Sequence, residues 1–306
     1  MRTLQGVLTA ALLIGAAVFV PTAPTAAEEA SDAIFHTLPV TFEKVATGYA
    51  FTEGPAADKD GHVFFTDIRN SRILRFDVTT DKATVFKEDS GKSNGLHFDA
   101  DGCLLACEGG RRRVVRWKGE ESVVLADAFG GKKLNSPNDL TLDQAGGVWF
   151  TDPRYGKQDN LEQDVMAVYY QPKEGKLKQV IRELPRPNGI ILSADGKTLF
   201  VAASSRKLIM AYPVTAPGVV GEGRVFAKLD DSRGGPDGMT LDAEGNLYCG
   251  GQGHIFVWSK TGKRLHKLPV PESPTNCTFG GPKRDVLYVT ARTSLYRVST
   301  KVKGAK

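Results

Sequence analysis

The sequence predicts an all-β fold, namely a six-bladed β-propeller with four-stranded blades whose ring is closed by an N-terminal strand. Three observations predict it. Gly and Pro are frequent, with 33 and 16 copies in 306 residues, which is typical of a chain that turns every few residues. A nine-residue pattern that begins with a polar residue and ends in Gly recurs every 39 to 50 residues. β-branched and aromatic segments follow each copy, which favours strands joined by hairpins.

The N-terminal segment has the pattern of a secretory signal peptide. Arg2 precedes an apolar run at 7–20, and small residues lead from there to Ala27. We therefore predict a signal peptide at 1–27, a linker at 28–36, and an exported protein that is periplasmic or secreted. The apolar run is shorter than the ~20 residues that span a bilayer, so we expect no stable membrane span after the signal is removed. An uncleaved N-terminal anchor is the alternative.

The repeated pattern gives the number of blades. Five copies align from their first polar residue to their closing Gly, and they occupy 53–61, 94–102, 138–146, 188–196 and 237–245. A sixth, looser copy begins at Asn276. This spacing is the period of a propeller blade of four short strands, so the pattern predicts six blades.

Strand-like segments fill the rest of each blade. After the first copy they occupy 62–67, 72–76 and 83–87. Only a polar and basic tail, 299–306, follows the third strand of the last blade, so that blade lacks a fourth strand. Residues 41–47, just before the first copy, would supply it and remove an open sheet edge. The propeller domain is therefore predicted to span 37–298.

Charge and cysteine usage exclude two classes of function. The formal net charge is +5, but Lys and Arg are scattered and 111–113 is the only tight cluster, so we expect no nucleic-acid partner. The cysteines have neither CxxC spacing nor a His at zinc-finger spacing, which argues against a zinc site. Buried free thiols are expected at Cys103, Cys107, Cys249 and Cys277.

Superposing the copies places six oxygen-bearing side chains around the channel axis at one mouth. They are the first residues of the copies, Glu53, Asn94, Asn138, Asn188, Asp237 and Asn276. Carboxylates and amide carbonyls without His or Cys suit a hard cation of the Ca²⁺ type. Glu53 is the residue that best separates a metal site from ordinary turns, because Glu has no particular use in a tight turn. Ordinary Asn-Gly and Asp-Gly turns around a metal-free channel remain the alternative.

A second set of carboxylates ends the second strand of the first three blades. These residues are Asp67, Glu108 and Asp152, and the antiparallel second strand returns them to the same mouth. Two interpretations remain for these carboxylates: they contact the substrate, or they are charges exposed to solvent at the rim. His97 is a candidate proton carrier near the mouth, and a packed or surface His is the alternative.

Short motifs at the blade starts carry a family resemblance. They are Glu53-Gly54-Pro55, Ser93-Asn94-Gly95, Asn135-Ser136-Pro137-Asn138-Asp139, Thr151-Asp152-Pro153, Arg186-Pro187-Asn188-Gly189, Pro236-Asp237-Gly238-Met239 and the segment 276–281. Together they resemble the SMP-30/gluconolactonase/LRE-like family of calcium-dependent six-bladed propellers. The resemblance covers nearly the whole mature chain.

The resemblance implies a site for one divalent cation. It implies that Glu53, Asn188 and Asp237 bind the cation directly, and that Asp237 is also the general base. Asn138 is implied to be a further ligand or a substrate contact. Ca²⁺ is the expected ion, with Mg²⁺, Mn²⁺ and Zn²⁺ as alternatives.

The rim of the site is less uniform than its axis. Arg154 and Tyr155 look like members of the family's substrate rim. The other candidate substrate contacts are Asn94, Asn138, Glu108, Asp152 and Asn276. The fourth blade departs from the pattern, because Ala202 and Ala203 replace the acidic strand end of the earlier blades.

These expectations lead to a metal-dependent hydrolase acting on carboxylic esters. The leading hypothesis is a gluconolactonase-like enzyme that hydrolyses a small sugar-acid lactone, with the cation polarising the carbonyl and Asp237 taking a proton from water. One alternative keeps the metal site for aryl esters or organophosphates. Another is a non-catalytic propeller that binds a peptide or glycan.

Overall fold

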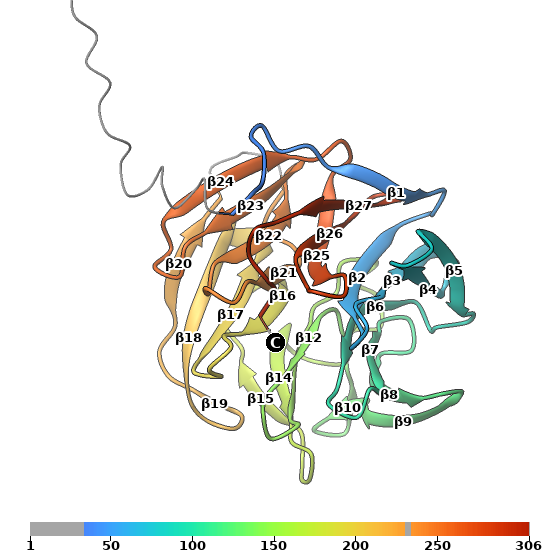
Figure 1. Cartoon of the computed structure of the whole chain (residues 1–306). Coiled ribbons are helices and arrows are strands. Elements are labelled where there is room, and N and C mark those ends of the chain that lie inside the picture. Colours follow the sequence, from blue (N-terminus) through green and yellow to red (C-terminus); the bar gives the residue numbers. More distant parts are fainter. Residues whose placement is uncertain (1–33, 230–233, 306) are drawn as a thin grey trace, which may run out of the picture.

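The computed structural model describes residues 34–229 and 234–305. Six β-sheets stand around a central channel, so the predicted six-bladed propeller is confirmed (Figure 1). The only helical elements in the described residues are two single turns of 3₁₀ helix, η1 (Ile68–Asn70) and η2 (Ser204–Arg206).

The first three blades are regular four-stranded antiparallel sheets, each built outwards from the channel. Blade one contains β2 (Thr52–Ala57), β3 (Val63–Asp67), β4 (Arg72–Asp77) and β5 (Lys82–Lys87). Blade two contains β6 (Ser93–Phe98), β7 (Leu104–Glu108), β8 (Arg113–Lys118) and β9 (Glu121–Ala126). Blade three contains β12 (Leu140–Leu142), β13 (Val148–Asp152), β14 (Ala167–Gln171) and β15 (Lys178–Ile181). A small hairpin precedes blade three and consists of β10 (Ala128–Phe129) and β11 (Lys132–Lys133).

The last three blades include the exceptions to this plan. Blade four adds a short strand and contains β16 (Pro187–Leu192), β17 (Thr198–Ala203), β18 (Leu208–Ala216), β19 (Val219–Val220) and β20 (Arg224–Lys228). Blade five contains β21 (Met239–Leu241), β22 (Leu247–Gly251), β23 (His254–Trp258) and β24 (Arg264–Pro269). Blade six takes one strand from the other end of the chain and contains β25 (Pro274–Gly280), β26 (Val286–Ala291), β27 (Ser294–Ser299) and β1 (Glu43–Thr47).

The repeat encodes the turn between the first and second strands of a blade. In blade one, Oδ1 of Asp58 accepts hydrogen bonds from the backbone N–H groups of Asp60 at 3.0 Å and His62 at 2.9 Å. The closing Gly61 has φ 86°, which strains any residue with a Cβ. The same carboxylate turn recurs at Asp99, Asp143 and Asp242. These turns explain why Asp and Gly recur at fixed positions.

The glycines after the axial polar residues have a different purpose. Gly95 lies within β6 and donates its N–H to the carbonyl of Asn138 in the next blade at 2.7 Å. A Cβ on Gly95 would lie only 2.9 Å from that same oxygen. Gly238 donates to the carbonyl of Thr275 at 2.8 Å in the same manner. These Asn-Gly and Asp-Gly pairs are therefore not ordinary turns, and they allow neighbouring blades to meet at the axis.

The ring closes as the sequence predicts. β1 pairs antiparallel with β27, with Glu43 opposite Arg297 and Thr47 opposite Ser294. Glu43 and Arg297 also form an ion pair with an Oε2–Nε distance of 2.8 Å. The N-terminal strand thus covers the outer edge of the sixth blade.

The segments that flank the predicted domain are part of the packed structure. Phe35, assigned to the linker, is buried and forms a bridge with Thr300. Val302 in the tail is also buried, and the N–H of Ala305 donates to the carbonyl of Leu241 at 2.9 Å. Figure 1 shows this end of the chain near the centre of the ring. The ordered fold therefore extends beyond 37–298, because both flanks bury apolar side chains and complete backbone hydrogen bonds.

The core lies between the blades and contains all four cysteines. Cys103, Cys107, Cys249 and Cys277 are free and buried, which confirms the prediction of free thiols. None of the helices that the structure describes has the length and apolar character of a membrane span. The predicted signal peptide at 1–27 lies outside the described residues.

Candidate active site

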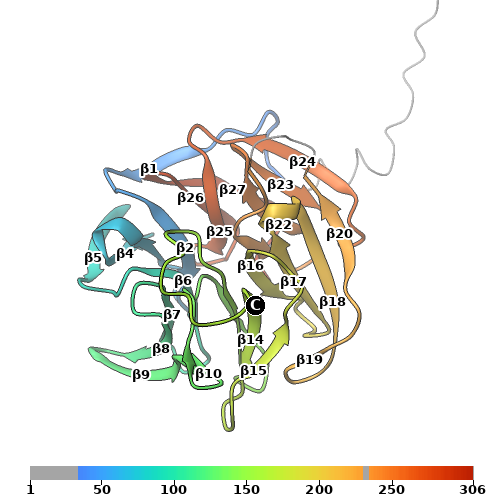
Figure 2. The same cartoon turned by 180° about the vertical axis from the view of Figure 1, so that it is seen from behind.

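One end of the channel opens into a cavity of about 1110 Å³, called here the mouth cavity. Its lining includes five of the six predicted axial residues, Glu53, Asn94, Asn138, Asn188 and Asp237. They come from the inner edges of five successive blades, so residues far apart in sequence share one site. In Figure 2 the connection between β13 and β14 crosses this end of the channel.

Two carboxylates, the buried Glu53 and the half-buried Asp237, dominate the electrostatics of the mouth cavity. Burial raises the pKa of Glu53 well above its usual range, and the nearby charge of Asp237 raises it further. The N–H of Gly54, which lies 2.9 Å from Oε2 of Glu53, opposes this rise. Burial likewise raises the pKa of Asp237 to about 7, against a hydrogen bond from Asn188. A cation held between these carboxylates would favour the ionised form of both.

A hydroxyl group holds Asn188, the axial residue of the fourth blade, in place. Nδ2 of Asn188 donates to Oγ of Ser204 at 3.3 Å, and that hydroxyl donates to the carbonyl of Pro236, next to Asp237. Ser204 begins η2, directly after the two alanines that depart from the family pattern. A serine at that point has no signature in the sequence, so sequence analysis did not single it out.

Asp139 is a third axial carboxylate that the sequence analysis missed as a site residue. It is buried, and Oδ1 accepts the N–H of Leu140 at 3.0 Å while Oδ2 lies 3.4 Å from the N–H of Ile190. Burial raises its pKa to about 7, and its charge raises the pKa values of Glu53 and Asp237. A signal was available, because Asn138-Asp139 stands where other blades have Asn-Gly.

The donors at the mouth fit a hard divalent cation. Within 34–229 and 234–305, no group of three His, Cys, Asp or Glu side chains is arranged to hold a metal ion. The mouth cavity instead combines the carboxylates of Glu53 and Asp237 with the amides of Asn138 and Asn188. Carboxylate and amide oxygens are the ligands that Ca²⁺ prefers. The raised pKa values of Glu53 and Asp237 agree with a site built for positive charge.

The second set of carboxylates supports the walls of the site and does not line the mouth cavity. Glu108 is buried, and its Oε2 accepts Nε of Arg113 at 2.6 Å. Asp152 is also buried and accepts the N–H groups of Asn135 and Ser136, each at 2.7 Å. These side chains were expected to contact either substrate or solvent. They are instead bound within the protein, although Oε1 of Glu108 is buried without a hydrogen-bond partner among the described residues. Asp152 holds the segment that leads to Asn138.

Asp67 has a similar structural role. It is buried, and its Oδ2 pairs with Nη2 of Arg72 at 3.1 Å while its Oδ1 accepts the N–H groups of Ala50 and Phe51, each at 3.0 Å. It therefore fixes the chain just before Glu53.

Arg154 and Tyr155 both line the mouth cavity. Nη2 of Arg154 donates to the carbonyl of Asn135 at 2.6 Å, and the hydroxyl of Tyr155 donates to the carbonyl of Arg186 at 3.3 Å. Burial raises the pKa of Tyr155, Asp237 raises it further, and Arg186 lowers it. Tyr155 is therefore close to both the axial carboxylate and the guanidinium of the rim.

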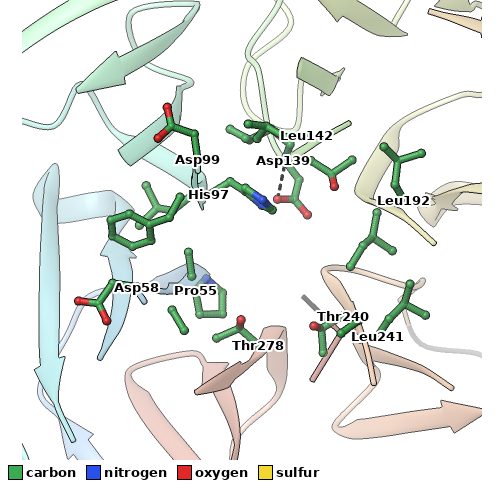
Figure 3. A pocket seen from close by; sticks show the side chains of 18 of the residues that line it. Pro55, Asp58, His97, Asp99, Asp139, Leu142, Leu192, Thr240, Leu241 and Thr278 are labelled. Atoms are coloured by element: carbon green, nitrogen blue, oxygen red, sulfur yellow. Dashed lines mark hydrogen bonds between the residues drawn. The ribbon is translucent and has the colours of Figure 1, made fainter. Parts of the chain in front are cut away.

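A second cavity of about 1060 Å³, the opposite chamber, lies at the other end of the channel. Asn276 and His97 line this chamber and not the mouth. Figure 3 shows His97 and Asp139 pointing toward one another across it. Asn276 still influences the mouth, because its side chain hydrogen-bonds to Glu53 and Asp139 and lowers the pKa of each. The placement of His97 separates it from the predicted ligands.

Comparisons with known proteins agree with this arrangement. A gluconolactonase of Zymomonas mobilis is 30% identical over 292 residues, covering 86% of this chain and 82% of its own. A regucalcin of Pongo abelii is 31% identical over 236 residues, covering 74% and 78%. The solved structure of a gluconolactonase from Xanthomonas campestris has a TM-score of 0.82 and 27% identity, covering 89% and 92%. The model of the SMP-30/gluconolactonase/LRE-like region matches residues 51–293. The chain therefore belongs to the SMP-30/gluconolactonase/LRE-like family.

Proposed function

We propose that this protein is a divalent-cation-dependent lactonase that hydrolyses the lactone of a sugar acid. The observation that carries the proposal is a pair of carboxylates, the buried Glu53 and the half-buried Asp237, which share one cavity with Asn138 and Asn188. The similarity to two gluconolactonases supports the reaction type.

The cation would be held by Glu53, Asn188 and Asp237, with Asn138 as a further ligand or a substrate contact. When bound, it supplies Lewis-acid polarisation of the lactone carbonyl and offsets the negative charge that develops on the carbonyl oxygen. Ca²⁺ is the proposed ion, because the donors are all oxygen atoms and two of them are neutral amides. Mg²⁺, Mn²⁺ and Zn²⁺ are the alternatives to be tested.

The protein's own groups would move the proton. Water adds to the lactone carbonyl carbon while Asp237 accepts one of its protons. The ring C–O bond then breaks, and the leaving ring oxygen takes that proton, so the product is an open-chain hydroxy acid. A bound cation would favour the ionised form of Asp237, which is the form that accepts a proton from water. Tyr155 and Arg154 would contact the substrate from the rim.

The decisive experiment is lactone hydrolysis with controlled metal content. Purified protein is treated with a chelator, and acid release from glucono-1,5-lactone is followed at constant pH with Ca²⁺, Mg²⁺, Mn²⁺ or Zn²⁺ supplied in turn. Turnover that is lost on chelation and restored by one of these ions supports the proposal. Turnover that survives chelation contradicts the cation requirement.

The same assay separates the alternatives. Hydrolysis of an aryl ester or an organophosphate without lactone hydrolysis would assign the site to that chemistry. A folded, metal-loaded protein that turns over none of these substrates would be a binding module.

We also propose that the protein is exported. The support is the charged, apolar and small-residue pattern of 1–27. Mass spectrometry of the mature N-terminus after cell fractionation tests this, and an intact Met1 in the cytoplasmic fraction would overturn it.

A further inference from the structure

The rim of the mouth cavity is strongly cationic. Six of its cationic side chains have no carboxylate partner within ion-pair distance in the part of the chain that the structure describes: Arg69, Lys92, Arg154, Lys157, Arg186 and Arg292. Among the residues that the structure describes, the acids that line the same cavity are Glu53, Asp237 and Asp159. Two of these three are the proposed cation ligands, so they do not neutralise the rim.

Some arginines elsewhere in the fold, in contrast, have acidic partners. Arg113 lies 2.6 Å from Glu108, and Arg297 pairs with both Glu43 and Asp81. Like charges gathered around a cleft repel one another and focus a positive potential into it. Such a rim lowers the stability of the folded chain and attracts anions.

Several rim arginines are held in defined positions. Arg154 donates Nη2 to the carbonyl of Asn135 at 2.6 Å, while its Nε is buried without a hydrogen-bond partner among the described residues. The guanidinium of Arg186 lies over the ring of Tyr155, with 5.8 Å between Cζ and the ring centroid. Arg69 lies over Phe51 in the same way, at 5.4 Å. Stacking fixes a guanidinium while leaving its N–H edge available for an oxyanion.

The two ends of the channel have opposite polarity. The opposite chamber has a similar volume, but acids predominate in its lining, including Asp58, Asp99, Asp101 and Asp143. The positive rim is therefore a property of the mouth and does not follow from the net charge of +5. An anion approaching the protein would be steered to the end that carries the proposed active site.

From this rim we propose that the preferred substrate is an anionic lactone, with a carboxylate or phosphate group remote from the ring carbonyl. The carbonyl would lie at the axial residues, and the anionic group would bind the guanidinium groups of Arg154 and Arg186 beside Tyr155. Arginine suits both anions because its planar N–H edge can donate two parallel hydrogen bonds. This inference rests on the proposed lactonase function and adds the substrate class.

The test compares three lactones on the metal-loaded enzyme. These are neutral glucono-1,5-lactone, its 6-phosphate, and a glucarolactone that carries a carboxylate. We expect kcat/KM to be at least tenfold higher for one or both anionic lactones, and this advantage to shrink as salt is raised from 50 to 500 mM. The two anionic substrates identify which anion is preferred. Equal or lower kcat/KM for both of them would overturn the proposal.

Variants locate the effect. Arg186→Gln and Arg154→Gln should each lower the ratio of anionic to neutral kcat/KM about tenfold, mainly through KM. Lys118→Gln removes the same charge from an exposed position on β8, outside the mouth cavity, and should leave the ratio unchanged. A ratio that is the same in Arg186→Gln, Arg154→Gln and wild type would contradict the assignment of the rim.

A binding measurement separates this inference from the proposed function. Calorimetry with 6-phosphogluconate and gluconate, on chelated protein, requires no turnover. If no lactone is hydrolysed, the lactonase proposal fails. In that case, tighter binding of 6-phosphogluconate that is lost in Arg186→Gln still supports an anion site at the rim, and equal binding of both compounds rejects it.

Discussion

The amide of Asn188 and the hydroxyl of Ser204 are linked by a hydrogen bond of 3.3 Å, and Ser204 in turn donates to the carbonyl of Pro236. One hydroxyl thus connects Asn188 of the fourth blade to the residue that precedes Asp237. Since the two proposed ligands lie on different blades, this bridge sets their relative position.

Ser204→Ala should therefore impair the site more than the fold. Loss of one hydrogen bond of this kind costs ~1 kcal/mol, and we expect a roughly fivefold lower kcat/KM together with weaker binding of the cation. Steady-state kinetics across a Ca²⁺ titration measures both. Ser205→Ala is the matched control, because Oγ of Ser205 donates to the carbonyl of Pro185 instead. Equal effects of the two variants would remove the special role of Ser204.

Asp237→Asn tests the base directly. The amide keeps the size of the side chain but cannot accept a proton from water, so kcat should fall by at least ~10³-fold. The folded protein should remain intact, since the change removes a carboxylate charge that repels Glu53. Single-turnover kinetics at saturating metal checks the rate, and circular dichroism checks the fold. Wild-type turnover in this variant would exclude Asp237 as the base.

Gly189→Ala should disturb the contact between blades four and five. A Cβ on Gly189 would lie 2.3 Å from the carbonyl oxygen of Asp237, too close for any real contact. Overpacking of this kind costs ~1–3 kcal/mol, so the unfolding temperature should fall by several degrees and turnover should fall with it. Gly156→Ala is the control, because its Cβ would meet nothing within 4 Å. Thermal unfolding of both variants distinguishes close packing from a general effect of replacing Gly.

Most of the fold could be predicted because its determinants are local and repeated. Carboxylate turns such as that of Asp58, and closing glycines such as Gly61 with positive φ, leave the same marks in successive blades. The missing strand of blade six was enough to predict that β1 closes the ring. The register of the repeats likewise brought Glu53 and Asp237 to one cavity.

The features that sequence analysis missed depend on single residues or on distant partners. Ser204 supports Asn188 from the start of a 3₁₀ turn and has no counterpart in the repeat. Glu108 accepts a hydrogen bond from Arg113, and the two residues come together only because β8 pairs antiparallel with β7. The cationic rim is assembled from loops of several blades and therefore has no period in the sequence.

His97 should make the protein less stable in mild acid. This side chain is half-buried in the opposite chamber; burial and then the charge of Arg284 lower its pKa to about 4, against the opposing charge of Asp99. In the unfolded chain His97 therefore takes up a proton near its ordinary pKa of 6.5. In the folded chain it takes up this proton only near pH 4. Stability should fall as pH drops from 6.5 to 4, by at most ~3 kcal/mol and by less where the ring reaches water.

His97→Gln should remove this part of the pH dependence. Urea unfolding at pH 7.5, 6, 5 and 4.5 measures the free energy of unfolding for both proteins. The difference between wild type and variant should change steadily across this range. A constant difference at all four pH values would show that His97 titrates alike in the folded and unfolded chains.

Glu272 should hold the ring closed. Its Oε1 accepts hydrogen bonds from Oγ of Ser294 at 2.6 Å and the hydroxyl of Tyr296 at 3.0 Å, both on β27, and lies 3.1 Å from Nζ of Lys44 on β1. Its Oε2 accepts the N–H of Thr293 at 2.9 Å. One carboxylate therefore connects the third strand of blade six to the strand that closes it.

Glu272→Gln should loosen this closure. Hydrogen bonds to a charged group contribute ~1.5–3 kcal/mol, so replacing the carboxylate by an amide should lower the unfolding temperature and expose β1 to proteases before the other blades.

Burial raises the pKa of Glu272, but hydrogen bonds from Ser294 and Thr293 outweigh it and lower the pKa to about 2. This stabilisation is fully present above the ordinary pKa of 4.5 and is lost as pH falls toward 2. The gap in unfolding free energy between wild type and Glu272→Gln should therefore be wide at pH 6 and narrow at pH 3. Glu174→Gln, at an exposed position, serves as the control, and limited proteolysis that cuts β1 equally in all three proteins would show that closure does not depend on Glu272.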